Sequence, residues 1–242
     1  MTGHVDVQPG TVLLCDADGT LFPSEEPAYE ASAGVTNRYL ASLGADRPYG
    51  PRELQRMTNG KNFRGAAAEL AGAFGREPVP SDLERWIAEE KDVVTAHLRT
   101  VLRPDPEVQK PLTRLAERFG LAIVTSSARS RMDACLEVTG LAPLFAADRR
   151  FSAEDSLPEP VSKPDPAVYL HAGRELGIDR AQGIAVEDSL NGARSAVAAG
   201  YRTIGIVLFV PEEDRAVRSA ALLATGADTV VSSWSELADL LL

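Results

Sequence analysis

Apolar residues follow two different periodicities along the chain. The run T-V-L-L-C at 11–15 is short and apolar, with a Gly-Thr turn close behind it, and it predicts a buried strand. Between about residues 25 and 100, apolar residues instead recur every three or four positions, which is typical of helices. Helices are expected at 29–43, 51–57, 63–74 and 81–98, separated by loops rich in Gly and Pro. Ser81 and Glu84 are spaced as in a capping box.

From about residue 101, strand and helix patterns alternate. Strands are expected at 121–124, 145–147, 184–186, 203–207 and 229–231, and helices at 128–138, 166–176, 190–199, 211–224 and 234–241. Such alternation predicts an α/β fold with a doubly wound, Rossmann-like parallel sheet. The helical block interrupts this sheet after its first strand. We therefore expect a discontinuous α/β core domain, residues 1–22 and 101–242, with an all-helical domain inserted at 23–100.

Composition and net charge limit the kinds of molecule that the protein is expected to bind. The 242 residues are 44% hydrophobic and 25% charged, which is ordinary for a globular protein. The net charge of −10, with no Lys/Arg run, argues against a nucleic-acid partner. No apolar stretch approaches 18 residues and the first ten residues are polar, so no membrane partner and a cytoplasmic location are expected. A monomer and a small homo-oligomer both fit this composition.

Acidic and hydroxyl side chains follow the ends of the predicted strands, and a lysine precedes the helix expected at 166–176. In open α/β sheets, ligands bind beyond the carboxyl ends of the strands, so these side chains are expected at one edge. They are Asp16, Asp18, Thr125, Ser126, Lys163, Glu187 and Asp188.

These residue types fit phosphoryl transfer, which needs a nucleophile, charge neutralisation and a proton source. Asp16 directly follows the first strand and can attack phosphorus, and Asp18 is placed to protonate the leaving oxygen and then to activate water. Gly19 permits a turn that a Cβ would hinder. Thr125 and Lys163 can hold the phosphate oxygens and balance their charge.

A carboxylate nucleophile repels a phosphate unless a cation intervenes. Asp16, Asp188 and Glu187 supply the oxygen ligands that suit Mg²⁺. The sequence therefore predicts Mg²⁺ as the cofactor.

Four motifs resemble those of the haloacid dehalogenase (HAD) superfamily, in the helical-cap subgroup of β-phosphoglucomutase-like and phosphoglycolate phosphatase-like proteins. They are L-C-D-A-D-G-T-L-F at 14–22, I-V-T-S-S at 123–127, S-K-P-D-P at 162–166 and V-E-D-S-L-N-G-A-R-S-A-V-A-A-G at 186–200. They occur in the family's order and span essentially the whole chain. The resemblance implies an α/β core with an inserted helical cap domain.

The resemblance also implies roles for single residues. Asp16 corresponds to the nucleophile and Asp18 to the acid/base. Thr125 and Lys163 correspond to the phosphate-binding residues. The metal ligands that it implies are Asp16, Asp188 and the backbone carbonyl of Asp18, with Glu187 acting through water.

The implied activity is Mg²⁺-dependent hydrolysis of a small organic phosphate monoester through an aspartyl-phosphate. A second aspartate at position 18 argues against dehalogenases and phosphonatases, which resemble this sequence but lack it. A phosphomutase of the β-phosphoglucomutase type stays an alternative, although such mutases often have a histidine about ten residues after this aspartate, where this chain has Ala28. A receiver-type signalling module would lack the helical insertion, and a non-catalytic phosphate binder would not need every key residue intact.

Further residues are candidates for binding the substrate. Gly19, Thr20 and Ser126 lie within the motifs, whereas Asn59, Lys61 and Arg64 belong to a polar loop between two predicted helices of the insertion. In similar proteins the equivalent loop approaches the active site. Sugar phosphates, phosphoglycolate and nucleotides all stay open as substrates.

Overall fold

The computed structural model describes residues 7–58 and 63–242. The chain divides into two compact units. An α/β unit combines the segment that ends at Pro23 with Arg103–Leu242, and a helical unit comprises Ser24–Leu102.

The α/β unit is built on a sheet of six parallel strands in the order β3-β2-β1-β4-β5-β6. The strands are β1 (Val12–Cys15), β2 (Gly120–Thr125), β3 (Arg150–Ser152), β4 (Gly183–Glu187), β5 (Arg202–Ile206) and β6 (Thr229–Val231). β1 pairs with both β2 and β4, with Leu14 opposite Ala122 on one side and Ala185 on the other. The first strand of the chain is therefore central, and the residues that follow it lie between those that follow its neighbours.

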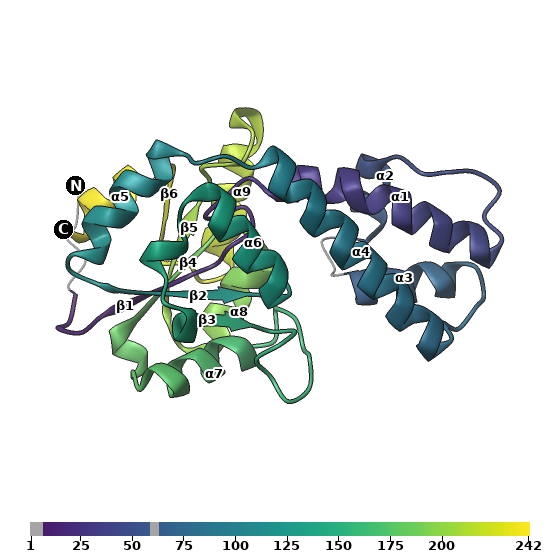
Figure 1. Ribbon diagram of the computed structural model, residues 1–242. Coiled ribbons are helices and arrows are strands. Elements are labelled where there is room, and N and C mark those ends of the chain that lie inside the picture. The colour runs from purple at the N-terminus through teal and green to yellow at the C-terminus, as the bar shows by residue number, and fades with distance from the viewer. Residues whose placement is uncertain (1–6, 59–62) are drawn as a thin grey trace. The chain divides into compact units, whose positions relative to one another are not determined.

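Helices cover both faces of this sheet (Figure 1). Leu14 and Val124 belong to a core cluster that they share with residues of α7 and α8. Successive strand residues point to opposite faces, so Leu13 and Ile123 face the other side, where they are also fully buried. Parallel strands that are buried on both faces carry continuous apolar runs, as this sequence does. The helices of this unit are α5 (Pro106–Ala116), α6 (Arg129–Thr139), α7 (Ala167–Leu176), α8 (Leu190–Ala199), α9 (Glu212–Ala224) and α10 (Trp234–Leu241).

The helical unit contains α1 (Glu25–Leu43), α2 (Pro51–Thr58), α3 (Phe63–Ala73) and α4 (Pro80–Val101). Its core includes Tyr39, whose hydroxyl donates to the carbonyl of Ala67 at 3.0 Å. The Tyr39 ring makes edge contacts with Phe63 and Trp86 at centroid distances of 6.4 and 6.1 Å. The parallel sheet with an all-helical insertion confirms the predicted fold class. Among the described residues, none of the helices is long and apolar enough to cross a membrane.

Two local predictions were wrong. The segment 145–147 is not a strand, because the edge strand β3 begins only at Arg150, after two short 3-10 helices at Ala142–Leu144 and Ala147–Arg149. The guanidinium of Arg150 fixes this connection by donating to Asp133 and to the carbonyls of Ala142 and Phe145. The expected capping box at Ser81 is also absent, because α4 already begins at Pro80 and its N-cap is Val79, without a side-chain cap.

Helix α5 was not predicted at all. It contains Pro111 in its interior, and proline normally argues against a helix. Its start nevertheless carries a readable signal, since Asp105 accepts a hydrogen bond from the backbone N–H of Glu107 at 2.8 Å and Pro106 occupies the first turn.

Candidate active site

Three neighbouring strands end at the candidate site. Asp16 directly follows β1, Thr125 is the last residue of β2 and Glu187 is the last residue of β4. The backbone N–H of Asp16 donates to the carbonyl of Val186 at 2.9 Å, which extends the hydrogen bonding between β1 and β4 by one residue. Because the strands are parallel, all three residues lie at the same edge of the sheet.

Lys163 joins these strand ends. Its ammonium donates to Oδ1 of Asp16 at 2.6 Å, to Oε1 of Glu187 at 2.6 Å and to the carbonyl of Val124 at 2.7 Å. The side chain is only 5% exposed. Burial by itself would lower the pKa of Lys163, but the carboxylates of Asp16 and Glu187 outweigh it and raise that pKa above its ordinary value. Lys163 is therefore a fixed cation held against Asp16.

The carboxylates of Asp16, Glu187 and Asp188 form a buried cluster in which one oxygen of each lies within 4.8 Å of the others. Burial raises the pKa of Asp16 and raises that of Glu187 to about 7, and in both cases Lys163 opposes the shift. One ammonium cannot neutralise three clustered carboxylates. A divalent cation with oxygen ligands, such as Mg²⁺, fits this donor set.

Asp188 is oriented by the turn that follows β1. Gly19 has a φ of +78°, and a Cβ there would lie 2.4 Å from Oδ2 of Asp188. The hydroxyl of Thr20 donates to Oδ1 of Asp188 at 3.0 Å, and the indole N–H of Trp234 donates to the carbonyl of Thr20 at 3.0 Å. In the structure, Gly19 and Thr20 thus orient a carboxylate of the site, and the substrate binding that the sequence suggests for them stays a prediction.

Asp18 lies beside the loop that follows β2. Its Oδ2 accepts a hydrogen bond of 2.6 Å from the hydroxyl of Ser127, a residue that sequence reasoning missed. The backbone N–H of Ser127 in turn donates to Oγ1 of Thr125 at 3.0 Å. The hydroxyl of Ser126 accepts from the backbone N–H of Lys163 at 3.3 Å. The run Thr-Ser-Ser therefore connects both Asp18 and the Lys163 loop to the end of β2.

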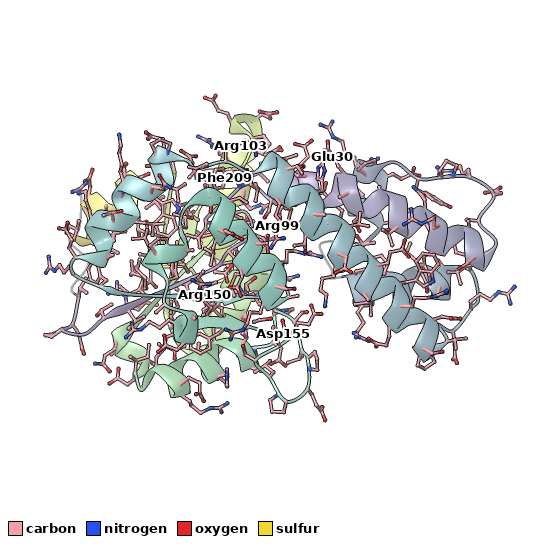
Figure 2. The ribbon with its side chains drawn as sticks, viewed as in Figure 1. Glu30, Arg99, Arg103, Arg150, Asp155 and Phe209 are labelled. Carbon is pink, nitrogen blue, oxygen red and sulfur yellow. The ribbon has the colours of Figure 1, made fainter. Side chains whose placement is uncertain are left out.

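This loop is itself anchored to the edge strand. Ser152, at the end of β3, donates its hydroxyl to the carbonyl of Ser127 at 2.8 Å. Asp155 accepts from the backbone N–H of Arg129, the first residue of α6, at 2.6 Å. Figure 2 labels Arg150, the first residue of β3, and Asp155, which lies shortly after the end of that strand. The edge strand thus fixes the backbone that positions Ser127.

Glu187 occupies space that only a glycine in α8 leaves free. A Cβ at Gly192 would lie 1.8 Å from Oε2 of Glu187. We expect Gly192→Ala to lower the free energy of unfolding by about 1–3 kcal/mol, because the methyl group has to displace a buried carboxylate. The matched control is Gly72→Ala in α3, where no atom lies within 4 Å of the new methyl group, and a gain of about 0.4–1 kcal/mol is expected. Urea denaturation measures both, and equal stabilities of the two variants would contradict this packing.

Comparison with known proteins decides the family. A model of haloacid dehalogenase-like hydrolases matches residues 11–200. The chain belongs to the haloacid dehalogenase-like hydrolase family. It is 31% identical over 196 residues to protein CbbY of Rhodobacter capsulatus, which covers 79% of this chain and 83% of that protein. It is 30% identical over 204 residues to a plasmid-encoded phosphoglycolate phosphatase of Cupriavidus necator, which covers 79% of this chain and 78% of the relative.

A solved structure of a related protein spans both units of this HAD-like hydrolase. It is a CbbY variant from Rhodobacter sphaeroides in complex with xylulose-1,5-bisphosphate, 26% identical, covering 96% of this chain and 99% of that one with a TM-score of 0.68. The family assignment confirms the resemblance inferred from the four motifs. It also confirms that the protein is an enzyme of the hydrolase class, and the relatives named as phosphatases agree with the predicted type of reaction.

The sequence predicts substrate contacts from three residues of the insertion, Asn59, Lys61 and Arg64, and these contacts stay predictions. Arg64 of the HAD-like hydrolase forms an exposed, two-pronged ion pair with Glu84 at 2.5 and 3.0 Å, within the helical unit. Asn59 and Lys61 lie outside the described residues.

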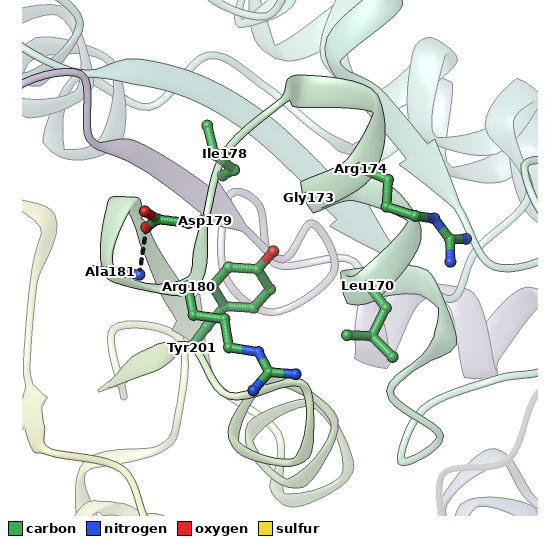
Figure 3. A pocket seen from close by; sticks show the side chains of 8 residues that line it. All are labelled: Leu170, Gly173, Arg174, Ile178, Asp179, Arg180, Ala181 and Tyr201. Carbon is green, nitrogen blue, oxygen red and sulfur yellow. Dashed lines mark hydrogen bonds between the residues drawn. The ribbon is translucent and has the colours of Figure 1, made fainter.

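A separate pocket of about 570 Å³ is lined by residues that include Tyr201, Arg174 and Arg180 (Figure 3). Tyr201 precedes β5, and Ile178, which also lines the pocket, precedes β4. The pocket therefore lies at the amino ends of these strands, opposite the edge that carries Asp16. None of the sequence-predicted site residues lines it.

Proposed function

We propose that this HAD-like hydrolase is a Mg²⁺-dependent phosphatase that hydrolyses a small organic phosphate monoester through an aspartyl-phosphate on Asp16. The observation that carries the proposal is the position of Asp16, flush with the end of β1, bound to Lys163 at 2.6 Å and clustered with two further buried carboxylates. The relatives named phosphoglycolate phosphatase, and the CbbY structure with a bound bisphosphate, support a small phosphorylated substrate.

In the first step, a carboxylate oxygen of Asp16 attacks the phosphorus atom. An O–P bond forms to Asp16 while the ester O–P bond breaks, and the leaving oxygen takes a proton from Asp18. Lys163 balances negative charge on the transferred phosphoryl group, and the hydroxyl and backbone N–H groups at the end of β2 bind its oxygens. The ammonium of Lys163, bound to Oδ1 of Asp16 at 2.6 Å, lies beside the carboxylate that attacks.

In the second step, water attacks the same phosphorus atom. Asp18, now a carboxylate, accepts a proton from the water, and the bond between Asp16 and phosphorus breaks to release inorganic phosphate. The hydrogen bond of 2.6 Å from Ser127 holds Asp18 at one orientation for both proton transfers. Asp18 is half-buried, which is consistent with a group that meets both substrate and water.

The carboxylates of Asp16 and Asp188 and the backbone carbonyl of Asp18 would hold Mg²⁺, with Glu187 assisting through water. When bound, the ion supplies positive charge that offsets the repulsion between a carboxylate nucleophile and a phosphate.

Removal of the metal tests this proposal most directly. Phosphate release with EDTA is expected to be at least about 100-fold slower than with Mg²⁺, because the clustered carboxylates then repel the substrate. Adding Mg²⁺ in excess over EDTA should restore the full rate, which serves as the control against unfolding. Equal rates in both buffers would contradict a metal-dependent reaction.

The substrate is identified by assaying phosphate release from a panel of small esters that includes phosphoglycolate, sugar monophosphates and bisphosphates, and nucleotides. Release from one or two members is the expected result. If phosphate instead moves between positions of a sugar without being released, the enzyme is a phosphomutase and the proposal is wrong.

A further inference from the structure

Tyr169 is a completely buried residue that touches two members of the candidate site. It lies in the first turn of α7, shortly after the Lys163 loop. The ammonium of Lys163 lies 5.2 Å from the centroid of its ring, and its hydroxyl donates to Oε1 of Glu187 at 2.5 Å. Tyr169 thus contacts the lysine through its ring and the carboxylate through its hydroxyl.

Two donors converge on a single oxygen of Glu187. Oε1 accepts from Tyr169 and from Lys163, whereas Oε2 is buried and has no hydrogen-bond partner among the described residues. A buried carboxylate is costly unless its hydrogen bonds are made, so its orientation is set by the two donors it has. Without the tyrosine hydroxyl, Lys163 would be the sole donor.

The orientation of the Lys163 ammonium depends in turn on Glu187, which is one of its acceptors. A lysine ammonium is a mobile charge at the end of a flexible four-carbon stem, and its direction is fixed only by its acceptors. The acceptors here are Asp16, Val124 and Glu187. Any turn of the Glu187 carboxylate would therefore move the ammonium relative to Asp16.

We propose that the hydroxyl of Tyr169 is a positioning group for the reaction, which fixes Glu187 and through it holds Lys163 against Asp16. The inference rests on the proposed phosphatase function and extends it to a residue that does not touch the substrate. Outer contacts of this kind are worth roughly 10–100-fold in activity in other sites.

Tyr169→Phe isolates the hydroxyl, because the ring that faces Lys163 is retained. Tyr201→Phe is the matched control, since Tyr201 belongs to the same core cluster, its ring lies 6.2 Å from that of Tyr169, and its hydroxyl makes no hydrogen bond among the described residues. We expect kcat of Tyr169→Phe to fall roughly 10–100-fold. KM for the ester and the Mg²⁺ concentration for half-maximal rate should stay within about twofold, as should all constants of Tyr201→Phe.

A double variant separates positioning from a general loss of packing. In a Glu187→Gln background, Tyr169→Phe should lower kcat little further, because the hydroxyl acts through that carboxylate. Additive losses would mean that Tyr169 acts by another route and would overturn the inference.

A measurement without turnover keeps this inference separate from the proposed function. The chain has only four lysines, Lys61, Lys91, Lys110 and Lys163. Buried and bound to three acceptors, Lys163 should give a slowly exchanging ammonium signal in ¹⁵N NMR spectra, identified by its disappearance in Lys163→Met. Tyr169→Phe should shift or broaden this signal, and Tyr201→Phe should leave it unchanged.

The outcomes distinguish the two proposals. If the wild-type enzyme releases no phosphate from any ester, the proposed function fails, while the ammonium signal still decides the role of Tyr169. If kcat and the ammonium signal of Tyr169→Phe both equal those of the wild type, the inference is wrong. It is equally wrong if kcat is retained and only the requirement for Mg²⁺ rises, because Tyr169 would then support the assistance that Glu187 gives to the metal and not the placement of Lys163.

Discussion

Replacing Asp16 with asparagine is expected to reduce phosphate release by about 10⁴-fold or more, to the limit of the assay. The amide oxygen is too weak a nucleophile to form the bond to phosphorus, so no aspartyl-phosphate can accumulate. The amide has nearly the shape of the carboxylate, and its oxygen can still accept the hydrogen bond that Lys163 donates at 2.6 Å. The loss should therefore appear in kcat, with the fold intact. Phosphate release and thermal melting of the same preparation measure the two effects.

Asp16→Asn is also expected to affect the melting temperature, in a direction that follows from the pKa of Asp16. Burial raises the pKa of Asp16 above its ordinary value, and Lys163 only partly opposes this. An acid whose pKa is higher in the folded than in the unfolded state is ionised at neutral pH at the expense of folding stability. Asparagine carries no charge, so in metal-free buffer at neutral pH its melting temperature should equal or exceed that of the wild type.

Asp148→Asn is the matched control for Asp16→Asn. Asp148 is exposed on a 3-10 helix of the α/β unit, and its substitution should change neither activity nor melting. Turnover of Asp16→Asn above about 1% of the wild-type rate would refute the assignment of the nucleophile. A large loss of melting temperature would instead show that the carboxylate is needed for the fold.

The edge of the sheet that carries the site could be predicted because its residues follow strand ends. Asp16, Thr125 and Glu187 each sit where an apolar run stops, and parallel strands bring such positions together. Lys163 was found through its motif, and the structure places it among them. Their catalytic roles stay predictions that the proposed experiments test.

Ser127 and Tyr169 could not be found in this way, because each acts through a contact that joins distant parts of the chain. Ser127 reaches Asp18 across 109 positions, and Tyr169 reaches Glu187 across 18. A serine after a strand and a tyrosine in a helix are ordinary in their local sequence. Only weak signals in the sequence could have pointed to these two residues. Ser127 is the third residue of the run Thr-Ser-Ser, and Tyr169 lies close in sequence to Lys163.

The errors in secondary structure also have local causes. The edge strand β3 has only three residues and follows two 3-10 turns, so apolar periodicity could not place it. Pro111 lies on the buried side of helix α5. The helix forms despite this proline because its tertiary packing outweighs the loss of one backbone hydrogen bond. At Ser81, Pro80 provides the helix start by its fixed φ, which makes a side-chain cap at the next residue unnecessary.

Asp18→Asn is expected to lower kcat by roughly 10²–10⁴-fold with alkyl phosphate esters, the usual effect of removing a general acid/base. The size of the loss should depend on the leaving group, because p-nitrophenolate departs without a proton whereas an alkoxide does not. With p-nitrophenyl phosphate the first step should be largely retained and the second step slow. We therefore expect a burst of about one equivalent of p-nitrophenol per enzyme, followed by slow turnover. Mass spectrometry of the variant after the burst should then detect one added phosphoryl group.

Ser127→Ala provides the graded comparison, because it removes the hydrogen bond of 2.6 Å that orients Asp18 but leaves its carboxylate in place. Its kcat should fall about tenfold, and no burst is expected since Asp18 can still activate water. Wild-type rates in Asp18→Asn with alkyl esters would contradict the acid/base assignment. Equal losses with both leaving groups and no burst would show that Asp18 contributes through position or metal binding, because only a proton donor distinguishes an alkoxide from a p-nitrophenolate.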